Sequence, residues 1–201
     1  MKKTIAFILA VLFMLSLTGC KQGFEHPTEK LSVEEWNATI VGACIVDYDE
    51  NSSFFSEALN AEKLASEQPV YPMPIFRLDT KKDLENFITT NSKHFSSRIP
   101  AEETTSFEAA VAEYDDAFFK ENSLLIVYFA CGSMSYKHDV SDIYCGGKSL
   151  CVHLKHTNNP EVTVEALAGY FMIIDIADDT VKNCKYFDVE FDLSQTAEAS
   201  T

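Results

Sequence analysis

The sequence predicts a single α+β domain in which a mainly antiparallel twisted sheet packs against about three helices. Five short apolar segments, rich in β-branched and aromatic residues, follow one another through the second half of the chain. The turns between them are short, which favours antiparallel pairing, because a parallel connection needs a crossover of about a dozen residues or more. Upstream of these segments, three stretches show the apolar spacing of amphipathic helices.

Strands and helices alternate in the first part of the predicted domain. An apolar run predicts a strand over residues 38–48, and helical spacing predicts a helix over 53–67. Three prolines interrupt the apolar residues of 70–78, which predicts an edge strand because proline cannot donate to a sheet ladder. A variant capping box at Thr80 begins a second helix that ends near Asn91.

The third helix and the strands of the second part follow from the same patterns. Thr105 and Glu108 form a capping box, and the apolar spacing after them predicts a helix over 105–118. Residues 124–130 are apolar without alternation, which predicts a central strand covered on both faces. Further strands are predicted at 136–144, 149–156, 170–176 and 185–193.

The N-terminus has the charged, apolar and small-residue order of a secretory signal. Its apolar run, residues 5–15, is shorter than the about 20 residues that a membrane-spanning helix needs. Leu17, Thr18, Gly19 and Cys20 resemble the lipobox of bacterial lipoproteins. The resemblance implies a signal peptide of residues 1–19, lipidation of Cys20, and a protein anchored to the cell membrane on its extracytoplasmic face. An ordinary cleaved signal with a chance cysteine is the alternative.

The predicted domain organisation follows from this N-terminus. Residues 20–37 are predicted to be the lipidated N-terminus and a flexible spacer, because they contain glycine, proline and alternating charges with little apolar periodicity. Residues 38–193 form the single domain, and 194–201 form a disordered tail.

The negative charge of the chain limits the classes of partner that it is expected to bind. The net charge is -15, and removal of the first 20 residues, which hold two lysines and no acid, makes it -17. An acidic body repels phosphate backbones, so nucleic acid is not an expected partner. It also repels anionic lipid head groups, so the expected membrane contact is the lipid on Cys20.

The cysteines and histidines indicate no cofactor, and the sequence predicts no metal site. Structural zinc sites usually contain two close pairs of cysteine or histidine, and these residues show no such pairs. On the predicted strand 149–156, Cys151 and His153 lie on the face opposite Val152 and Leu154, and two ligands do not make a site. Six such side chains gather within 26 residues: Cys131, His138, Cys145, Cys151, His153 and His156.

Two other uses of the cysteines are considered. Cys145 and Cys151 flank a Gly-Gly turn, and a hairpin register centred on Lys148 would bring them together as a disulfide. Cys131 follows a central strand and precedes a Gly-Ser turn, where nucleophiles are often found, but a buried cysteine that ends a strand is commoner. No catalytic residue is nominated.

Several segments of the second half occur in a characteristic order, namely Leu125–Tyr128, Gly132–Tyr136, Val140, Leu150–Leu154, Asn159–Pro160 and Gly169–Ile174. They resemble the PrcB-type protease-stabilising domain of a spirochaete surface protease complex and of uncharacterised lipoproteins of Gram-positive anaerobes. The resemblance implies a non-catalytic domain that binds or stabilises another envelope protein, such as a protease. The family turn commonly ends in Gly-Tyr, where this chain has Ser135-Tyr136.

These observations lead us to expect a lipid-anchored envelope protein that is not an enzyme. The expected contact with a partner is the polar turn between rigid strands, formed by Gly132, Ser133, Met134, Ser135 and Tyr136. An envelope hydrolase with a Cys/His site and a small-solute-binding lipoprotein are the alternatives.

Overall fold

The computed structural model describes residues 24–46, 52–69, 71–95, 105–161 and 166–191. The predicted signal peptide, Cys20 and the predicted tail lie outside these ranges. Within them, no helix is both long and apolar enough to cross a bilayer.

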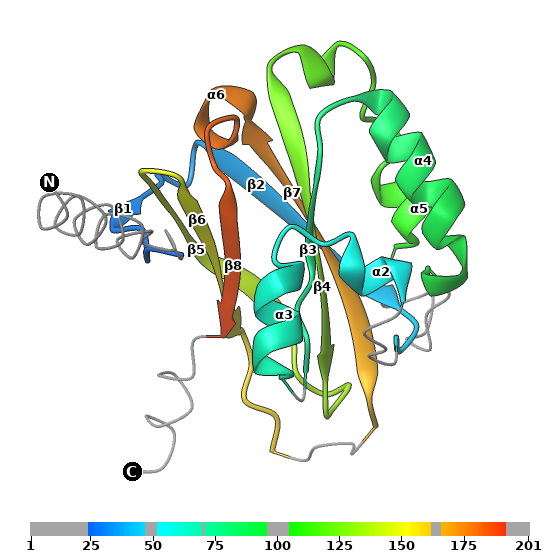
Figure 1. Cartoon of the computed structure of the whole chain (residues 1–201). Helices are drawn as coiled ribbons and strands as arrows, with labels where there is room; N and C mark the ends of the chain where they lie inside the picture. The colour runs from blue at the N-terminus through cyan, green and yellow to red at the C-terminus, as the bar shows by residue number, and fades with distance from the viewer. Residues whose placement is uncertain (1–23, 47–51, 70, 96–104, 162–165, 192–201) are drawn as a thin grey trace, which may run out of the picture.

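Two four-stranded sheets pack face to face and form most of the molecule (Figure 1). The first sheet has the order β1-β5-β6-β8 and the second has the order β2-β7-β4-β3. The strands of the first sheet are β1 (Glu29–Lys30), β5 (His138–Gly146), β6 (Ser149–His156) and β8 (Tyr186–Phe191). Those of the second are β2 (Trp36–Ala43), β7 (Ala168–Ala177), β4 (Asn122–Cys131) and β3 (Ile75–Leu78).

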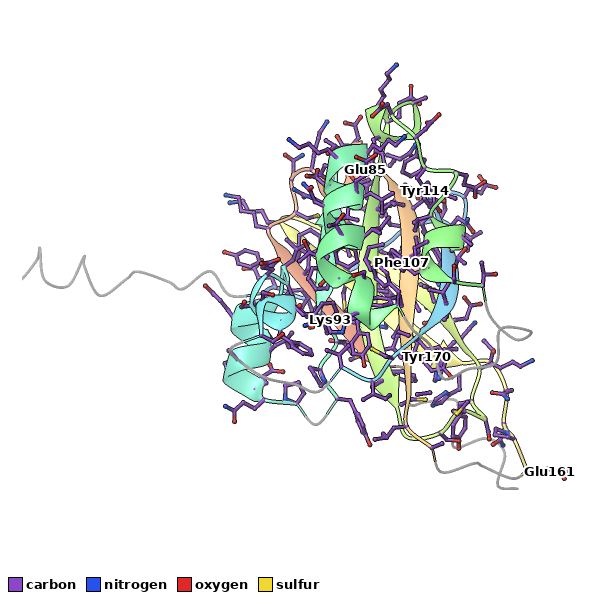
Figure 2. All side chains as sticks on the ribbon, turned by 90° about the vertical axis from the view of Figure 1, so that its right-hand side faces the viewer. Glu85, Lys93, Phe107, Tyr114, Glu161 and Tyr170 are labelled. Carbon is purple, nitrogen blue, oxygen red and sulfur yellow. The ribbon has the colours of Figure 1, made fainter. Side chains whose placement is uncertain are left out.

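Helices cover the outer face of the second sheet and confirm the predicted single-domain α+β class. Figure 2 shows α4 and α5, with Phe107, in front of β4 and β7. The described helices are α2 (Ser53–Ser56), α3 (Ala61–Glu67), α4 (Lys81–Asn91), α5 (Phe107–Ala110) and α6 (Asp178–Val181), with 3-10 turns η1 (Ser92–His94) and η2 (Phe118–Lys120).

The central strand β4 supplies both hydrophobic cores. Leu125, Val127 and Phe129 face the first sheet and join the core between the sheets. Leu124, Ile126 and Tyr128 point the other way, into the core beneath the helices. All six are buried, because alternate residues of a strand face opposite sides and here both sides are covered. The prediction of a central strand covered on both faces is confirmed.

Two of the predicted helices are shorter than expected, and at each break a polar side chain is hydrogen-bonded to backbone groups outside an α-helix. The helix predicted over 105–118 is reduced to α5 and η2. The Asp115 carboxylate accepts hydrogen bonds from the backbone N–H groups of Ala117 (2.9 Å) and Phe118 (3.0 Å), a local turn that competes with a helix. The helix predicted over 53–67 is divided into α2 and α3. Buried Asn60 lies at the division and bonds the backbone of Met73 and Ile75.

One strand pair departs from the antiparallel arrangement that dominates both sheets. β6 and β8 pair in parallel, with His153 opposite Glu190. The chain leaves the first sheet after β6, passes through β7 in the second sheet, and returns along β8. The required crossover is therefore a strand of the other sheet and not a long helix. The remaining strand pairs are antiparallel.

Part of the predicted spacer belongs to the folded domain. β1 pairs with β5, and the side chain of Leu31 is buried in the core between the sheets. β2 begins at Trp36, before the predicted boundary at residue 38. The alternating charges of this segment fit an edge strand, because charged residues are also common on exposed strand edges.

Gly169 is placed where no larger residue fits. A Cβ atom at this position would lie 2.5 Å from the Cys44 carbonyl oxygen and 3.1 Å from the Tyr128 hydroxyl. We expect Gly169→Ala to lower the free energy of unfolding by about 1–3 kcal/mol through overpacking. Urea unfolding measures the change. Gly146→Ala is the matched control, because its Cβ would meet only ordinary contacts at 3.6 Å and beyond; equal losses in the two variants would contradict the explanation.

Candidate functional site

The turn predicted to contact a partner follows β4 and is held by hydrogen bonds. Asn158 accepts from the backbone N–H of Lys137 (2.6 Å) and donates to the Ser135 carbonyl (2.8 Å). The hydroxyl of Ser133 accepts from the Ser135 N–H at 3.2 Å, and Ser133 is 6% exposed. Ser133 therefore stabilises the turn from inside, whereas Gly132 is exposed and Tyr136 is half-buried.

Apolar side chains are exposed beside this turn. Four large hydrophobic residues are exposed in the described ranges, and two of them, Tyr71 (49%) and Leu167 (50%), lie near Gly132. A Cβ atom on Gly132 would be 3.8 Å from the Tyr71 hydroxyl. Leu167 directly precedes Ala168, the register partner of Cys131. We call Tyr71, Gly132, Met134, Tyr136 and Leu167 the turn surface.

The predicted disulfide between Cys145 and Cys151 is wrong. The two-residue turn after Gly146, in which Gly147 has φ +62°, pairs Cys145 with Leu150 and Cys151 with Tyr144. A register shift of one residue reverses the face of every side chain, so the two thiols lie on opposite faces of the hairpin.

Cys145 instead lies beside Cys184. Their sulfur atoms are 3.6 Å apart, and each also lies 3.6 Å from the Thr180 carbonyl oxygen. The hydrogen bond from Cys184 lowers the pKa of Cys145 to about 7, against the opposing effect of burial. The same bond, with burial, raises the pKa of Cys184. A depressed pKa makes Cys145 the reactive thiol of the pair.

Cys131 does not have the surroundings of a nucleophile. Its thiol donates to the Ser133 carbonyl oxygen at 2.8 Å, and burial raises its pKa. A thiolate nucleophile needs the opposite shift. Another thiol, Cys44, lies 3.8 Å from Nδ1 of His94, but that imidazole is buried against the ring of Phe54 and its pKa is lowered by burial. Cys131 therefore lacks the lowered thiol pKa that the Cys/His alternative requires, and His94 is a weaker base than an ordinary histidine.

His138 and His156 form a pair of tilted, contacting rings within an aromatic cluster at one end of the two sheets. They are register partners on β5 and β6, with ring centroids 4.9 Å apart, and Phe191 packs against both. Both ring nitrogens of His138 are buried without a hydrogen-bond partner. Burial, together with the charge of the neighbouring His156, lowers the pKa of His138 to about 4.

We expect His138 to make the protein sensitive to acid. Its folded pKa of about 4 lies below the ordinary histidine pKa of 6.5, so the unfolded chain binds more protons between these two values. The stability that depends on neutral His138 is therefore complete above pH 6.5 and is lost as the pH falls toward 4. Urea unfolding of the chain and of His138→Phe at several pH values tests this. The variant should lose less stability over that range, and identical pH profiles would contradict the assignment.

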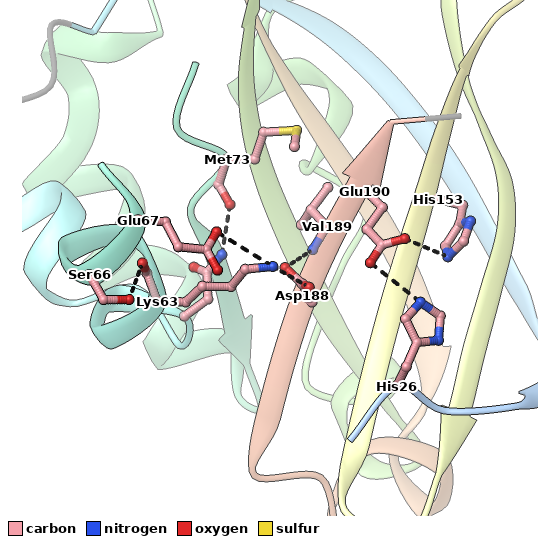
Figure 3. A network of polar contacts seen from close by, with 10 residues as sticks. His26, Lys63, Ser66, Glu67, Met73, His153, Asp188, Val189 and Glu190 are labelled. Atoms are coloured by element: carbon pink, nitrogen blue, oxygen red, sulfur yellow. Dashed lines mark hydrogen bonds and ion pairs between the residues drawn. The ribbon is translucent and has the colours of Figure 1, made fainter. Parts of the chain in front are cut away.

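A second group of polar side chains lies on the outer face of the first sheet (Figure 3). One ligand atom from each of His26, Cys151, His153 and Glu190 lies within 4.8 Å of the others. Nε2 of His26 is 3.3 Å from Glu190 Oε1, and Nε2 of His153 is 3.7 Å from Glu190 Oε2. Burial, with the negative charges of Glu190 and Asp188, raises the pKa of Cys151 to about 12. The thiol is therefore protonated when no cation is near. We call these four residues the outer-face cluster.

Asp188 lies beside the outer-face cluster but is already neutralised. Its carboxylate, 3% exposed, accepts a hydrogen bond of 2.5 Å from the Lys63 ammonium of α3 (Figure 3). It also accepts from the backbone N–H of Val189 at 2.9 Å. Burial alone would lower the pKa of Lys63, but the bond and charge of Asp188 raise it overall. The ion pair fastens α3 to β8.

No family model, curated protein or solved structure matches this chain. The resemblance to the PrcB-type domain therefore stays a prediction from the sequence.

The sequence predicted the shared face of Cys151 and His153 but no site there. That face is opposite Val152 and Leu154, and the structure confirms this because the latter two lie in the core between the sheets. His26 and Glu190 were not predicted to lie beside Cys151 and His153. The signal available for Glu190 was the alternation of β8, but its position next to His153 depends on the unexpected parallel pairing.

Proposed function

We propose that this chain is a lipid-anchored, non-catalytic protein of the cell envelope that binds or stabilises another envelope protein. The anchor is the lipid on Cys20, at the extracytoplasmic face of the membrane. The observation that supports the binding role most directly is the turn surface, where exposed Tyr71 and Leu167 flank a turn fixed by hydrogen bonds.

The turn surface combines exposed apolar area with a rigid backbone. Aromatic side chains are enriched at protein interfaces, and contiguous exposed apolar groups often mark them. Tyr136 is held by its ring contact with His156, whose centroid is 4.4 Å away. A fixed surface loses little conformational entropy when a partner binds, so more of the contact energy appears as affinity.

The position of the N-terminal segment supports a short connection to the membrane. Phe24 already contacts the domain, with the Lys63 ammonium 5.9 Å from its ring, and it is four positions after Cys20. A lipid on Cys20 would therefore hold the domain close to the bilayer. The net charge of -17 beyond that point favours contact through the lipid alone.

Metabolic labelling with a fatty-acid probe tests the anchor. We expect the expressed chain to be labelled and to fractionate with membranes, and Cys20→Ser to lose both properties. Cys131→Ser is the matched control, because it removes another cysteine and leaves the lipobox unchanged. Labelling that persists in Cys20→Ser would refute the proposed anchor.

Cross-linking in the host tests the turn surface. We expect the double variant Tyr71→Ala/Tyr136→Ala, and separately Met134→Ala, to reduce the recovery of a specific envelope protein. Val33→Ala is the control, because Val33 is 73% exposed and lies outside the turn surface. Unchanged recovery of every partner in the turn-surface variants would contradict this binding site.

A groove favours solute binding as a second candidate function. It lies between α3 and β8, has a volume of about 940 Å³, and is lined by Phe24, Leu59 and Lys63 among others. Ligand sites commonly have volumes of about 300–1,000 Å³. A thermal-shift panel of amino acids and sugars tests this function, since a ligand at 100 times its dissociation constant stabilises the fold by about 2.7 kcal/mol. No shift with any compound would count against it.

A further inference from the structure

We infer that the outer-face cluster is a binding site for a zinc-type divalent cation, with His26, Cys151, His153 and Glu190 as its ligands. This inference goes beyond the proposed function and does not depend on it.

The identity of the four side chains fits such an ion. Zinc is bound by cysteine sulfur, histidine nitrogen and carboxylate oxygen, usually with four ligands in a tetrahedron. The thiolate of Cys151 and the carboxylate of Glu190 would together balance the two positive charges. Hard cations such as Mg²⁺ and Ca²⁺ instead prefer all-oxygen sites, which this group does not provide.

The backbone places three of the ligands in advance. Cys151 and His153 are two residues apart on β6 and therefore share a face. The parallel pairing puts Glu190 of β8 directly opposite His153. His26 approaches from the N-terminal segment, and its ring meets that of His153 edge to face at 5.8 Å. The ligand atoms are within 4.8 Å of one another. In a tetrahedral zinc site the ligand atoms are about 3.3–3.7 Å apart, so small side-chain movements would bring them to these separations.

Two further observations point to a ligand. Nε2 of His153 is buried and has no hydrogen-bond partner, although it faces Glu190 at 3.7 Å. Nδ1 of His26 lies 3.1 Å from the Pro27 carbonyl oxygen, so a proton on Nδ1 leaves the Nε2 lone pair facing the cluster. Metal-binding histidines commonly have this backbone contact on the second nitrogen.

The cation would also fasten the N-terminal segment. His26 is six positions after Cys20, and its side chain is 49% exposed, so a metal could enter from solvent on this side. Binding would connect the chain that follows the lipid anchor to β6 and β8. Asp188 would not compete as a ligand, because Lys63 already occupies its carboxylate.

Cobalt titration tests the site. The full chain is purified in detergent under reducing conditions, stripped with a chelator, and titrated with Co²⁺ and then with Zn²⁺. We expect one equivalent of Co²⁺ to bind, to produce a thiolate-to-cobalt charge-transfer band in the near ultraviolet, and to be displaced by Zn²⁺. Cys151→Ser should remove the band, whereas Cys145→Ser, which changes a thiol outside the cluster, should retain it.

A second variant, at the half-exposed residue His26, tests the site if Cys151→Ser fails to fold. His26→Gln should fold, as shown by circular dichroism, and bind Co²⁺ at least about ten-fold more weakly. Glu25→Gln is its control, because Glu25 is the adjacent residue and lies outside the cluster.

The inference is overturned if the chain binds no stoichiometric metal, if the band survives in Cys151→Ser, or if His26→Gln binds as tightly as Glu25→Gln. The turn-surface variants should bind the cation normally, so a failure of the proposed function is distinguishable.

Discussion

Replacing Phe171 with alanine is expected to lower the free energy of unfolding by about 3–5 kcal/mol, the usual cost of removing a buried phenylalanine ring. Phe171 lies on β7, is fully buried, and belongs to the core beneath the helices. Its ring centroid is 5.3 Å from that of Phe107, 5.5 Å from that of Phe95 and 5.5 Å from that of Tyr128. The truncation would therefore leave a cavity between the sheet and the segments that cover it.

Urea unfolding followed by far-ultraviolet circular dichroism measures this loss. Phe119→Ala is the matched control, because that ring is only partly buried at the margin of the same core. We expect its cost to be less than half that of Phe171→Ala. A similar cost in both variants would show that Phe171 is not the centre of this core.

The strands that have a clear pattern could be predicted from the sequence alone. β6 has the predicted bounds, Ser149–His156, and β4 is the central strand that an unbroken apolar run indicates. The cap of α4 is also the predicted one, since the Thr80 side chain accepts a hydrogen bond from the Asp83 N–H. Each of these features depends on neighbouring residues, which a sequence displays directly.

Most of the features that could not be predicted depend on contacts between segments that are distant in the sequence. The division of the strands into two sheets, and hence the parallel pairing of β6 with β8, is decided by which faces bury each other. The outer-face cluster inherits this difficulty, because its four residues come from the N-terminal segment, β6 and β8. The long helix expected at 105–118 does not form, and here the reason is local. The Asp115 side chain accepts backbone hydrogen bonds in a turn that competes with the helical ones.

Mild oxidation is expected to join Cys145 and Cys184 and to raise the free energy of unfolding by about 3–4 kcal/mol. The cross-link would close a loop between positions 39 residues apart, and restricting the unfolded chain over such a loop gives a stabilisation of this size. The sulfur atoms are 3.6 Å apart before any bond forms, so rotation of the two side chains brings them together.

The chemistry follows from the unequal pKa values of the two thiols. With its pKa near 7, Cys145 is partly thiolate at neutral pH and attacks oxidised glutathione, forming a mixed disulfide and releasing one glutathione thiolate. The Cys184 sulfur, after losing its proton to solvent, then attacks the Cys145 sulfur of the mixed disulfide and releases the second glutathione. The two protein thiols are oxidised, and one glutathione disulfide is reduced.

Peptide mapping without reductant identifies the bond, and urea unfolding with and without reductant measures its contribution. Cys184→Ser should lose both the cross-linked peptide and the gain in stability, whereas Cys151→Ser should keep the cross-linked peptide because Cys151 lies on the opposite face of the hairpin. A map that joins Cys145 to Cys151 would contradict the observed register of β5 and β6. It would also move Cys151 out of the outer-face cluster, so this one measurement bears on the hairpin and on the inferred cation site together.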